Sequence, residues 1–180
     1  DWTELKRLVR YLKCTENLEL RLSKTSENSS LIGYTDSDWA ESKDRKSTTG
    51  FLFKFNGGTV CWSSKKQTLV ALSTAESEYV ALSESCKEAV WLKNVLADLG
   101  HKISGAIVMH EDNQSCLAII QNGKYSNRTK HIDIKYFYVQ ELKMQGVIDF
   151  VYCPTEVMEA DILTKPLPPT RFKTLRSKIG

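Results

Sequence analysis

The sequence predicts an α/β fold built on a five-stranded mixed sheet, three antiparallel strands followed by two parallel ones, with helices on both faces. Two observations lead to this fold. First, the expected elements follow the order strand, strand, strand, helix, strand, helix, helix, strand, helix. Second, the first three strands follow one another directly, whereas each later strand comes after a helix, as in right-handed parallel crossovers. A chain of 180 residues suits one such domain with a short appendage.

We divide the chain into an N-terminal helix and linker (1–29), the domain itself (30–166) and a basic C-terminal tail or helix (167–180). Residues 2–13 carry three leucines and a valine on one helical stripe, which indicates a short amphipathic helix, and the polar residues after it are interpreted as a linker. Because the chain begins with Asp1 and no apolar leader follows, we expect a segment of a longer protein.

Three strands open the domain, at residues 31–36, 49–55 and 59–64. The second strand alternates phenylalanines with Leu52 and Lys54. A glycine pair at 57–58 separates the second strand from the third, and such a pair is typical of a tight hairpin. These three strands therefore form the antiparallel part of the sheet.

The longest helical pattern covers residues 73–99. It opens with Ser73 and Glu76, which have the spacing of a capping box, and the glycine that follows residue 99 ends it. The short apolar run at 107–110 is expected to be a buried strand, and residues 113–121 continue as a helix.

The last part of the chain repeats the helix–strand alternation. We expect a helix at 132–144, a fifth strand at 147–153 and a short helix at 156–164 that ends at a group of prolines. The final segment, 165–180, contains five basic residues and no acid.

The composition excludes some classes of protein and leaves others open. With 41% hydrophobic and 26% charged residues, and no apolar run of about 18 residues, the chain is not expected to cross a membrane. A net charge of +3 is too small to identify nucleic acid as the partner. Basic clusters at 43–46, 65–66 and 165–180 suit a polyanion, although each cluster alone fits solvated surface lysines equally well.

The five cysteines and three histidines do not form a recognisable metal or disulfide pattern. The cysteine number is odd, the spacings are wide and no Cys-x-x-Cys occurs, so we interpret the cysteines as buried thiols of an intracellular protein. The histidines are too scattered to suggest a zinc site.

Acids at the ends of the expected elements are the main candidates for function. Asp36 and Asp112 each follow an apolar strand, where ligands of α/β sheets usually bind, and Asp161 lies on the final short helix. Taken singly, these residues fit a turn, a helix cap and a solvated side chain. If they converge, their oxygen ligands would suit Mg²⁺ or Mn²⁺ better than zinc.

Glu78 is the acid that is hardest to explain as a surface residue. At about 100° per residue, Glu78 falls within the apolar arc of its helix, whereas Glu76 falls beside Lys87 and Asn94. Glu76 is accounted for by the capping box. A buried ionised carboxylate is costly unless it is paired or bound to a metal, so Glu78 is a candidate ligand.

Seven segments, taken in order and spacing, resemble the ribonuclease H domain of copia-type LTR retrotransposon Pol polyproteins. The similarity covers the chain from about Leu31 to Pro166, and residues 1–15 resemble the connection that precedes this domain after the polymerase. The segments are YTDSDWA (34–40), RKSTTGF (45–51), WSSKKQ (62–67), STAESEY (73–79), EDNQS (111–115), RTKHIDI (128–134) and ADILTK (160–165).

The resemblance implies a ribonuclease H-like fold and an endonuclease that hydrolyses the RNA strand of RNA/DNA hybrids with two Mg²⁺ ions, for which Mn²⁺ can substitute. It implies four catalytic metal ligands, which are Asp36, Glu78, Asp112 and Asp161. Asp36 would bridge both ions, and Asp161 would complete the second. The choice of Glu78 agrees with the helical arc, whereas strand alternation does not separate Asp36 from Asp38.

The resemblance also implies contacts with the hybrid backbone. The candidates are basic, hydroxyl and amide side chains: Lys46, Ser47, Thr48, Ser63, Ser64, Lys65, Asn113, Gln114 and Arg128. One departure from many cellular ribonucleases H is the absence of a histidine in the loop before Asp161. His131 is a possible auxiliary residue from another element, with Glu156 and Glu159 as alternatives.

The implied setting is retrotransposon reverse transcription, with the polymerase domain of the same polyprotein as a partner. The expected location is the cytoplasm, in virus-like particles, with the nucleus as an alternative. Two other functions remain open: a non-catalytic hybrid-binding or structural module of a reverse transcriptase, and an integrase-like DNA nuclease of the same superfamily. Cleavage of a hybrid and of duplex DNA would distinguish these functions.

Overall fold

The computed structural model contains a five-stranded sheet in the order β3-β2-β1-β4-β5. It describes residues 1–22, 30–40, 43–122 and 130–180, and only the backbone of residues 130–132. β1 pairs antiparallel with β2 and parallel with β4, and β5 is parallel to β4, which confirms the predicted fold class. The strands are β1 (Leu31–Asp38), β2 (Thr48–Phe55), β3 (Gly58–Lys66), β4 (Ile107–Glu111) and β5 (Ile148–Tyr152).

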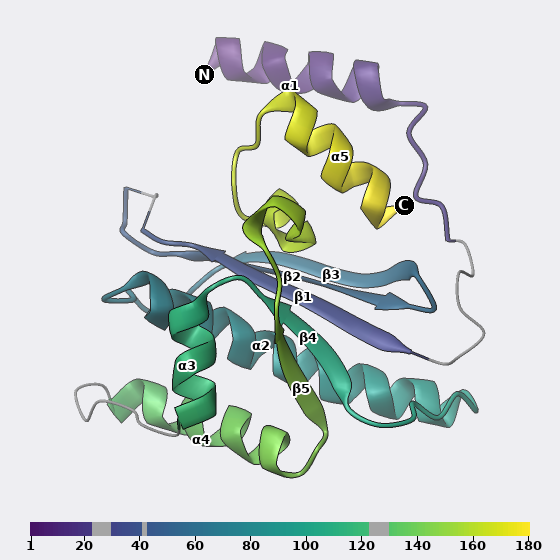
Figure 1. Cartoon of the computed structure of the whole chain (residues 1–180). Helices are drawn as coiled ribbons and strands as arrows, with labels where there is room; N and C mark the ends of the chain where they lie inside the picture. Colours follow the sequence, from purple (N-terminus) through teal and green to yellow (C-terminus); the bar gives the residue numbers. More distant parts are fainter. Residues whose placement is uncertain (23–29, 41–42, 123–129) are drawn as a thin grey trace.

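Helices cover both faces of this sheet (Figure 1). On one face lie α2 (Thr74–Asp98), α3 (Gln114–Asn122) and α4 (Lys130–Met144). The other face carries two 3₁₀ segments, η1 (Thr155–Val157) and η2 (Glu159–Leu163), followed by α5 (Pro169–Ile179) and α1 (Trp2–Thr15). No helix in the described part of the chain is both long and apolar enough to span a membrane.

The predicted short helix at 156–164 is wrong in one respect, because η1 and η2 are separate 3₁₀ segments. Met158 lies between them with an extended backbone (φ −65°, ψ 107°). Its side chain is fully buried, so the chain turns there to place Met158 in a small cluster with Cys153 and Ala160. This turn brings η2 onto the sheet beside β1 and β2.

The predicted capping box fixes the start of α2. Ser73 Oγ accepts a hydrogen bond from the backbone N–H of Glu76 (3.2 Å), and Glu76 Oε2 accepts one from the N–H of Leu72 (2.8 Å). The first bond satisfies a backbone donor that the first helical turn leaves free, and the second ties Leu72, which precedes the helix, to Glu76. At the other end, Gly100 has a φ of +86° and closes the helix as expected.

The core between the sheet and α2 holds β1 in place. Gly33 is central to it, because a β-carbon there would lie 2.6 Å from the Phe53 ring and would also overlap the Met109 sulfur. Phe53 and Met109 are its neighbours on β2 and β4, and both are fully buried. This packing fixes the central strand, whose last residues carry the candidate acids.

The cysteines differ from expectation at two positions. Cys14 is exposed on α1 and Cys61 is partly exposed, so the interpretation of all five cysteines as buried thiols is wrong for these two.

The C-terminal segment packs against the body of the molecule: Leu175 is fully buried, and Lys54 Nζ donates a hydrogen bond to the carbonyl of Lys178 (2.8 Å). α5 is therefore part of the surface that surrounds the candidate site.

Candidate active site

Three acids from three elements meet at the ends of the central strands. One carboxylate oxygen from each of Asp36, Glu78 and Asp112 lies within 4.8 Å of the other two, and we call these residues the acidic triad. Asp36 lies on β1, Glu78 in the first turns of α2, and Asp112 directly after β4. Because β1 and β4 are parallel neighbours, their carboxyl ends lie at the same edge of the sheet.

The structure separates Asp36 from Asp38. Asp38 Oδ1 accepts a hydrogen bond from the backbone N–H of Thr48, so this carboxylate ties the end of β1 to β2. Asp36 is fully buried and contributes to the acidic triad. The strand also extends two residues beyond the predicted end, because Asp38 pairs with Thr48.

Glu78 is buried, as its angular position predicted, with 6% of its surface exposed. Among the described residues, its Oε2 atom has no hydrogen-bond partner. Burial raises the pKa of Glu78 well above its ordinary value, and the nearby carboxylates of Glu111, Asp36 and Asp112 raise it further. A carboxylate in this position is suited to bind a cation.

Glu111 is a fourth acid at this edge, and the sequence analysis did not identify it. It is fully buried, and burial raises its pKa well above the ordinary value. Oε1 accepts the backbone N–H of Asn113 (3.0 Å), whereas Oε2 has no hydrogen-bond partner in the described part of the chain. Strand alternation could have indicated it, because Glu111 shares a face with the fully buried Ile107 and Met109.

Asp161 lies outside the acidic triad and is joined to it by a cation. Lys165 Nζ lies 2.7 Å from Asp161 Oδ1 and 2.8 Å from Asp36 Oδ1. The other oxygen of Asp161 pairs with the guanidinium of Arg171 on α5. The structure thus brings three of the four predicted ligands together and connects the fourth through Lys165.

Asp36 is held by polar contacts as well as by burial. Thr164 Oγ1 donates a hydrogen bond to Asp36 Oδ2, and Lys165 pairs with the other oxygen. Burial raises the pKa of Asp36 from 3.8 to about 6, and the lysine and threonine reduce this rise without cancelling it. The site thus contains several carboxyl groups that the described residues do not fully neutralise.

The donor set fits a hard divalent cation. The acidic triad offers only oxygen ligands, and the buried Oε2 atoms of Glu78 and Glu111 have no hydrogen-bond partner among the described residues. Mg²⁺ and Mn²⁺ prefer such ligands, whereas zinc and copper favour nitrogen and sulfur. A bound cation would also lower the pKa of these carboxyl groups.

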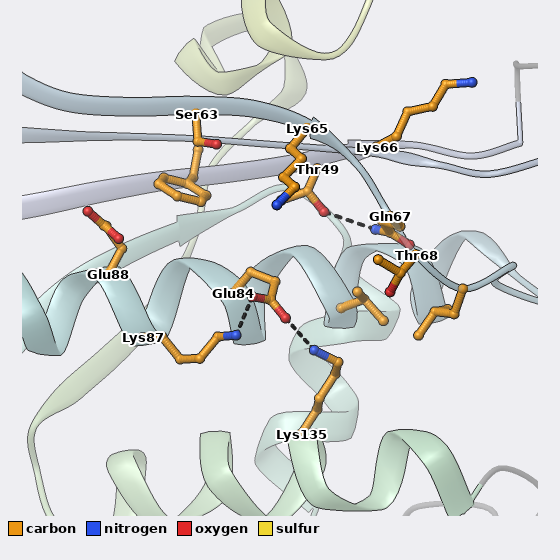
Figure 2. A pocket seen from close by; sticks show the side chains of 13 residues that line it. Thr49, Ser63, Lys65, Lys66, Gln67, Thr68, Glu84, Lys87, Glu88 and Lys135 are labelled. Carbon is orange, nitrogen blue, oxygen red and sulfur yellow. Dashed lines mark hydrogen bonds and ion pairs between the residues drawn. The ribbon is translucent and has the colours of Figure 1, made fainter.

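A basic pocket of about 450 Å³ lies between β3 and α2, beside the site. Figure 2 shows Glu84 within it, joined to Lys87 and Lys135 by ion pairs. The Gln67 amide donates hydrogen bonds to Thr49 Oγ1 (3.1 Å) on β2 and to the carbonyl of Ser77 (2.9 Å) on α2, which fixes the pocket wall to β2 and α2. Two predicted hybrid contacts, Ser63 and Lys65, line this pocket together with Lys66.

The other predicted hybrid contacts are more dispersed. Ser47 is fully buried and accepts the N–H of Ala40 (3.3 Å), and Ser64 donates to the carbonyl of Leu163 (2.6 Å). Asn113 caps α3 by accepting the N–H of Cys116 (2.9 Å). Lys46 and Thr48 are partly exposed and Gln114 is exposed. Arg128 lies outside the described residues, as does the side chain of His131.

The two acids considered as alternatives to His131 differ in their surroundings. Glu159 is buried and forms an ion pair with Lys54 (2.6 Å), so it contributes to the packing of η2 on β2. Glu156 is exposed on η1, next to Thr155. Thr155 Oγ1 donates a hydrogen bond to Asp112 Oδ2 (2.7 Å), which brings η1 to the edge of the acidic triad.

In sequence, the chain is similar to retrovirus-related Pol polyproteins of plant transposons. The chain is 39% identical, over 99% of its length, to the retrovirus-related Pol polyprotein from transposon TNT 1-94 of Nicotiana tabacum. It is 36% identical, over 98% of its length, to the corresponding polyprotein from transposon RE1 of Arabidopsis thaliana. The chain covers only 13% and 12% of these relatives. No family model matches the chain.

Among solved structures, the ribonuclease H1 LC11, isolated from compost, superimposes with a TM-score of 0.57 and 20% identity. The match covers 76% of this chain and 93% of that enzyme. The complex of LC11 with an RNA/DNA hybrid superimposes with a TM-score of 0.55 and 19% identity, over 74% of this chain and 93% of LC11.

Proposed function

The chain is homologous, along nearly its whole length, to a segment of copia-type retrotransposon Pol polyproteins and has a ribonuclease H-like fold, and on this premise we propose that it is a metal-dependent ribonuclease H. Its reaction would be hydrolysis of the RNA strand of RNA/DNA hybrids during reverse transcription. The acidic triad carries this proposal, because three buried or partly buried carboxylates converge at the sheet edge where this fold presents its ligands.

Asp36, Glu78 and Asp112 are the residues that would hold one Mg²⁺ ion, and Asp36 with Asp161 would hold a second. Two such ions supply activation of the attacking water and stabilisation of the leaving 3′-oxygen. Thr164 orients Asp36 by donating a hydrogen bond to Oδ2. Thr155 does the same for Asp112, through a bond of 2.7 Å.

Neighbouring residues would support substrate binding. The exposed Lys65 and the partly exposed Ser63 line the basic pocket beside the triad, where a phosphate of the hybrid could be held. LC11 ribonuclease H1, which shares the fold, forms a complex with an RNA/DNA hybrid, and this supports the choice of substrate. Selection of the RNA strand would depend on contacts with the 2′-hydroxyl groups in the minor groove.

The polyprotein relatives suggest a partner for the chain. The chain aligns with about an eighth of each relative, so it corresponds to one segment of a much longer polyprotein. We propose that the polymerase domain of the same polyprotein is its neighbour. α1 is consistent with a segment that contacts another domain, because Leu8 and Leu12 on its apolar stripe are more than half exposed.

A cleavage assay with two labelled substrates tests the proposed function. The chain should cut the RNA strand of an RNA/DNA hybrid when Mg²⁺ is present and should leave duplex DNA intact. Asp112→Asn should lose cleavage and still bind the hybrid, because the substitution removes a ligand charge and keeps the shape of the side chain. Binding without cleavage by the unmodified chain would favour the non-catalytic module, and cleavage of duplex DNA would favour the integrase-like nuclease.

A further inference from the structure

Both oxygens of Asp161 are occupied by cations of the chain itself. Oδ1 pairs with Lys165 Nζ at 2.7 Å, and Oδ2 pairs with the guanidinium of Arg171. Asp161 is fully buried, so no oxygen of this carboxylate faces open solvent. In this arrangement a divalent ion could bind Asp161 only by displacing one of the two side chains.

On the other side of the site, no cation among the described residues pairs with the carboxylates of Glu78 and Glu111 in the same way. Glu78 Oε2 and Glu111 Oε2 are buried and have no hydrogen-bond partner in the described part of the chain. Lys165 reaches only as far as Asp36, whose Oδ1 lies 2.8 Å from Nζ. The site is therefore asymmetric, with a free carboxylate oxygen on the side of Glu78 and two ion pairs on the side of Asp161.

We propose that Lys165 and Arg171 are internal counterions that compete with a divalent ion for Asp161. An ion would then bind first to the acidic triad, and a second would bind at Asp161 only when one of these cations is displaced. This inference rests on the proposed function, since it concerns the second of the two ions that the proposed mechanism requires.

The two cations are held by different contacts. Lys165 lies on the short segment after η2, and its side chain (30% exposed) is no more exposed than that of Arg171 (32%). Its two ion-pair partners, Asp36 and Asp161, are both proposed metal ligands. Arg171 also donates a hydrogen bond to the carbonyl of Thr155, and α5 is anchored where Thr59 Oγ1 donates to the carbonyl of Ile179 (2.7 Å). An incoming ion would therefore compete with Lys165 at both of its ion pairs and with Arg171 at one of its two contacts.

A titration with Mn²⁺ in the absence of nucleic acid tests this competition. Bound ions are counted by electron paramagnetic resonance for the unmodified chain, Lys165→Met and Arg171→Met, with the exposed Lys173→Met as the matched control. Each of the first two substitutions should tighten binding of the second ion by at least about tenfold, because it removes a charge in direct contact with Asp161. Lys173→Met should leave both binding constants unchanged.

Unchanged binding constants would contradict the proposal. If Lys165→Met and Arg171→Met bind the second ion no more tightly than the unmodified chain, the competition is wrong. Thermal melts check that each variant is folded, and Lys165→Gln replaces Lys165→Met if the latter does not fold.

A second measurement uses the unmodified chain and so does not depend on any variant. Acetylation of lysines is followed by mass spectrometry, with and without Mg²⁺, and the rate at Lys165 is compared with the rate at Lys173. An ion that displaces Lys165 releases its Nζ atom from the two carboxylates into solvent, so the amine becomes more accessible to the acetylating reagent. We expect an increase at Lys165 alone, and equal rates with and without Mg²⁺ would overturn the inference.

These results are separable from a failure of the proposed function. A chain that binds no divalent ion would refute the proposed metal-dependent activity. A chain that cleaves the hybrid, but whose second binding constant does not respond to Lys165 or Arg171, would refute only the competition.

Discussion

Ser37 donates a hydrogen bond to Ser77 at 2.9 Å, and this bond joins β1 to α2 beside two residues of the acidic triad. Both serines are buried, and their neighbours in sequence are Asp36 and Glu78. Ser77 also donates to the carbonyl of Thr74 (2.8 Å), so its hydroxyl group accepts one hydrogen bond and donates another. The bond fixes the position of the helix relative to the strand at the point where their carboxylates meet.

Ser77→Ala is expected to weaken both the fold and the metal site. Loss of the buried hydroxyl leaves Ser37 without its acceptor and should lower the free energy of unfolding by about 1–2 kcal/mol. Affinity for Mn²⁺ should fall by about tenfold, because Glu78 is no longer held against Asp36. Ser85→Ala is the control, since Ser85 is buried in the same helix and donates only to the carbonyl of Leu82. Equal Mn²⁺ affinity in the two variants would contradict a positioning role for Ser77.

Stability without metal should fall as the pH rises. The pKa of Asp36 is raised from 3.8 to about 6, so the folded protein holds more protons than the unfolded chain between these values. The contribution of Asp36 is therefore fully present below about pH 3.8 and is lost as the pH rises through about 6. Melting temperatures in EDTA should show this decline, and Asp36→Asn should reduce it. Mg²⁺ should restore stability mainly above pH 6, because it binds the ionised form.

Glu111→Gln should stabilise the metal-free protein above neutral pH. The substitution removes a buried acid that raises the pKa of Glu78, and the new amide oxygen can still accept the N–H of Asn113. We expect a gain of about 1 kcal/mol in the free energy of unfolding at pH 8, measured by denaturation in EDTA. A loss of stability of similar size would mean that the Glu111 charge is already neutralised in the folded protein.

Lys65→Ala should weaken hybrid binding in a salt-dependent way. If Lys65 contacts a phosphate from the basic pocket, its removal lowers the slope of log affinity against log salt by about 1. Lys102→Ala is the matched control, because Lys102 is exposed just before β4, at the opposite end of that strand from the acidic triad. Binding is measured with catalytically inactive Asp112→Asn at several salt concentrations. An unchanged slope would place the phosphate contacts elsewhere.

Local patterns were sufficient to predict most of the fold. The five strands follow from apolar runs and turn residues, and the change from antiparallel to parallel pairing follows from the helices that precede the last two strands. The order β3-β2-β1-β4-β5 within the sheet comes from the structure. The start of α2 follows from the spacing of Ser73 and Glu76. The angular position of Glu78 predicted that this acid is buried, because a helix face is determined by residue spacing alone.

The parts of the site that were not predicted depend on contacts distant in the sequence. Asp38 could be separated from Asp36 only by the pairing of β1 with β2. Lys165 contacts Asp36 across the whole domain, and Arg171 reaches Asp161 because α5 packs back onto η2. No periodicity in the sequence encodes these contacts. Strand alternation indicates that Glu111 is buried, but its neighbour Asp112 was predicted as the metal ligand.

The most direct test of the proposed function compares Glu78→Gln with Glu76→Gln in Mg²⁺-dependent cleavage of a labelled RNA/DNA hybrid. The two glutamates lie two residues apart on one helix, yet only Glu78 belongs to the acidic triad, whereas Glu76 caps the helix. Glu78→Gln should reduce the rate of RNA cleavage by at least about 100-fold, and Glu76→Gln should keep a rate close to that of the unmodified chain. Cleavage by Glu78→Gln at the unmodified rate would contradict the assignment of this site as the catalytic centre.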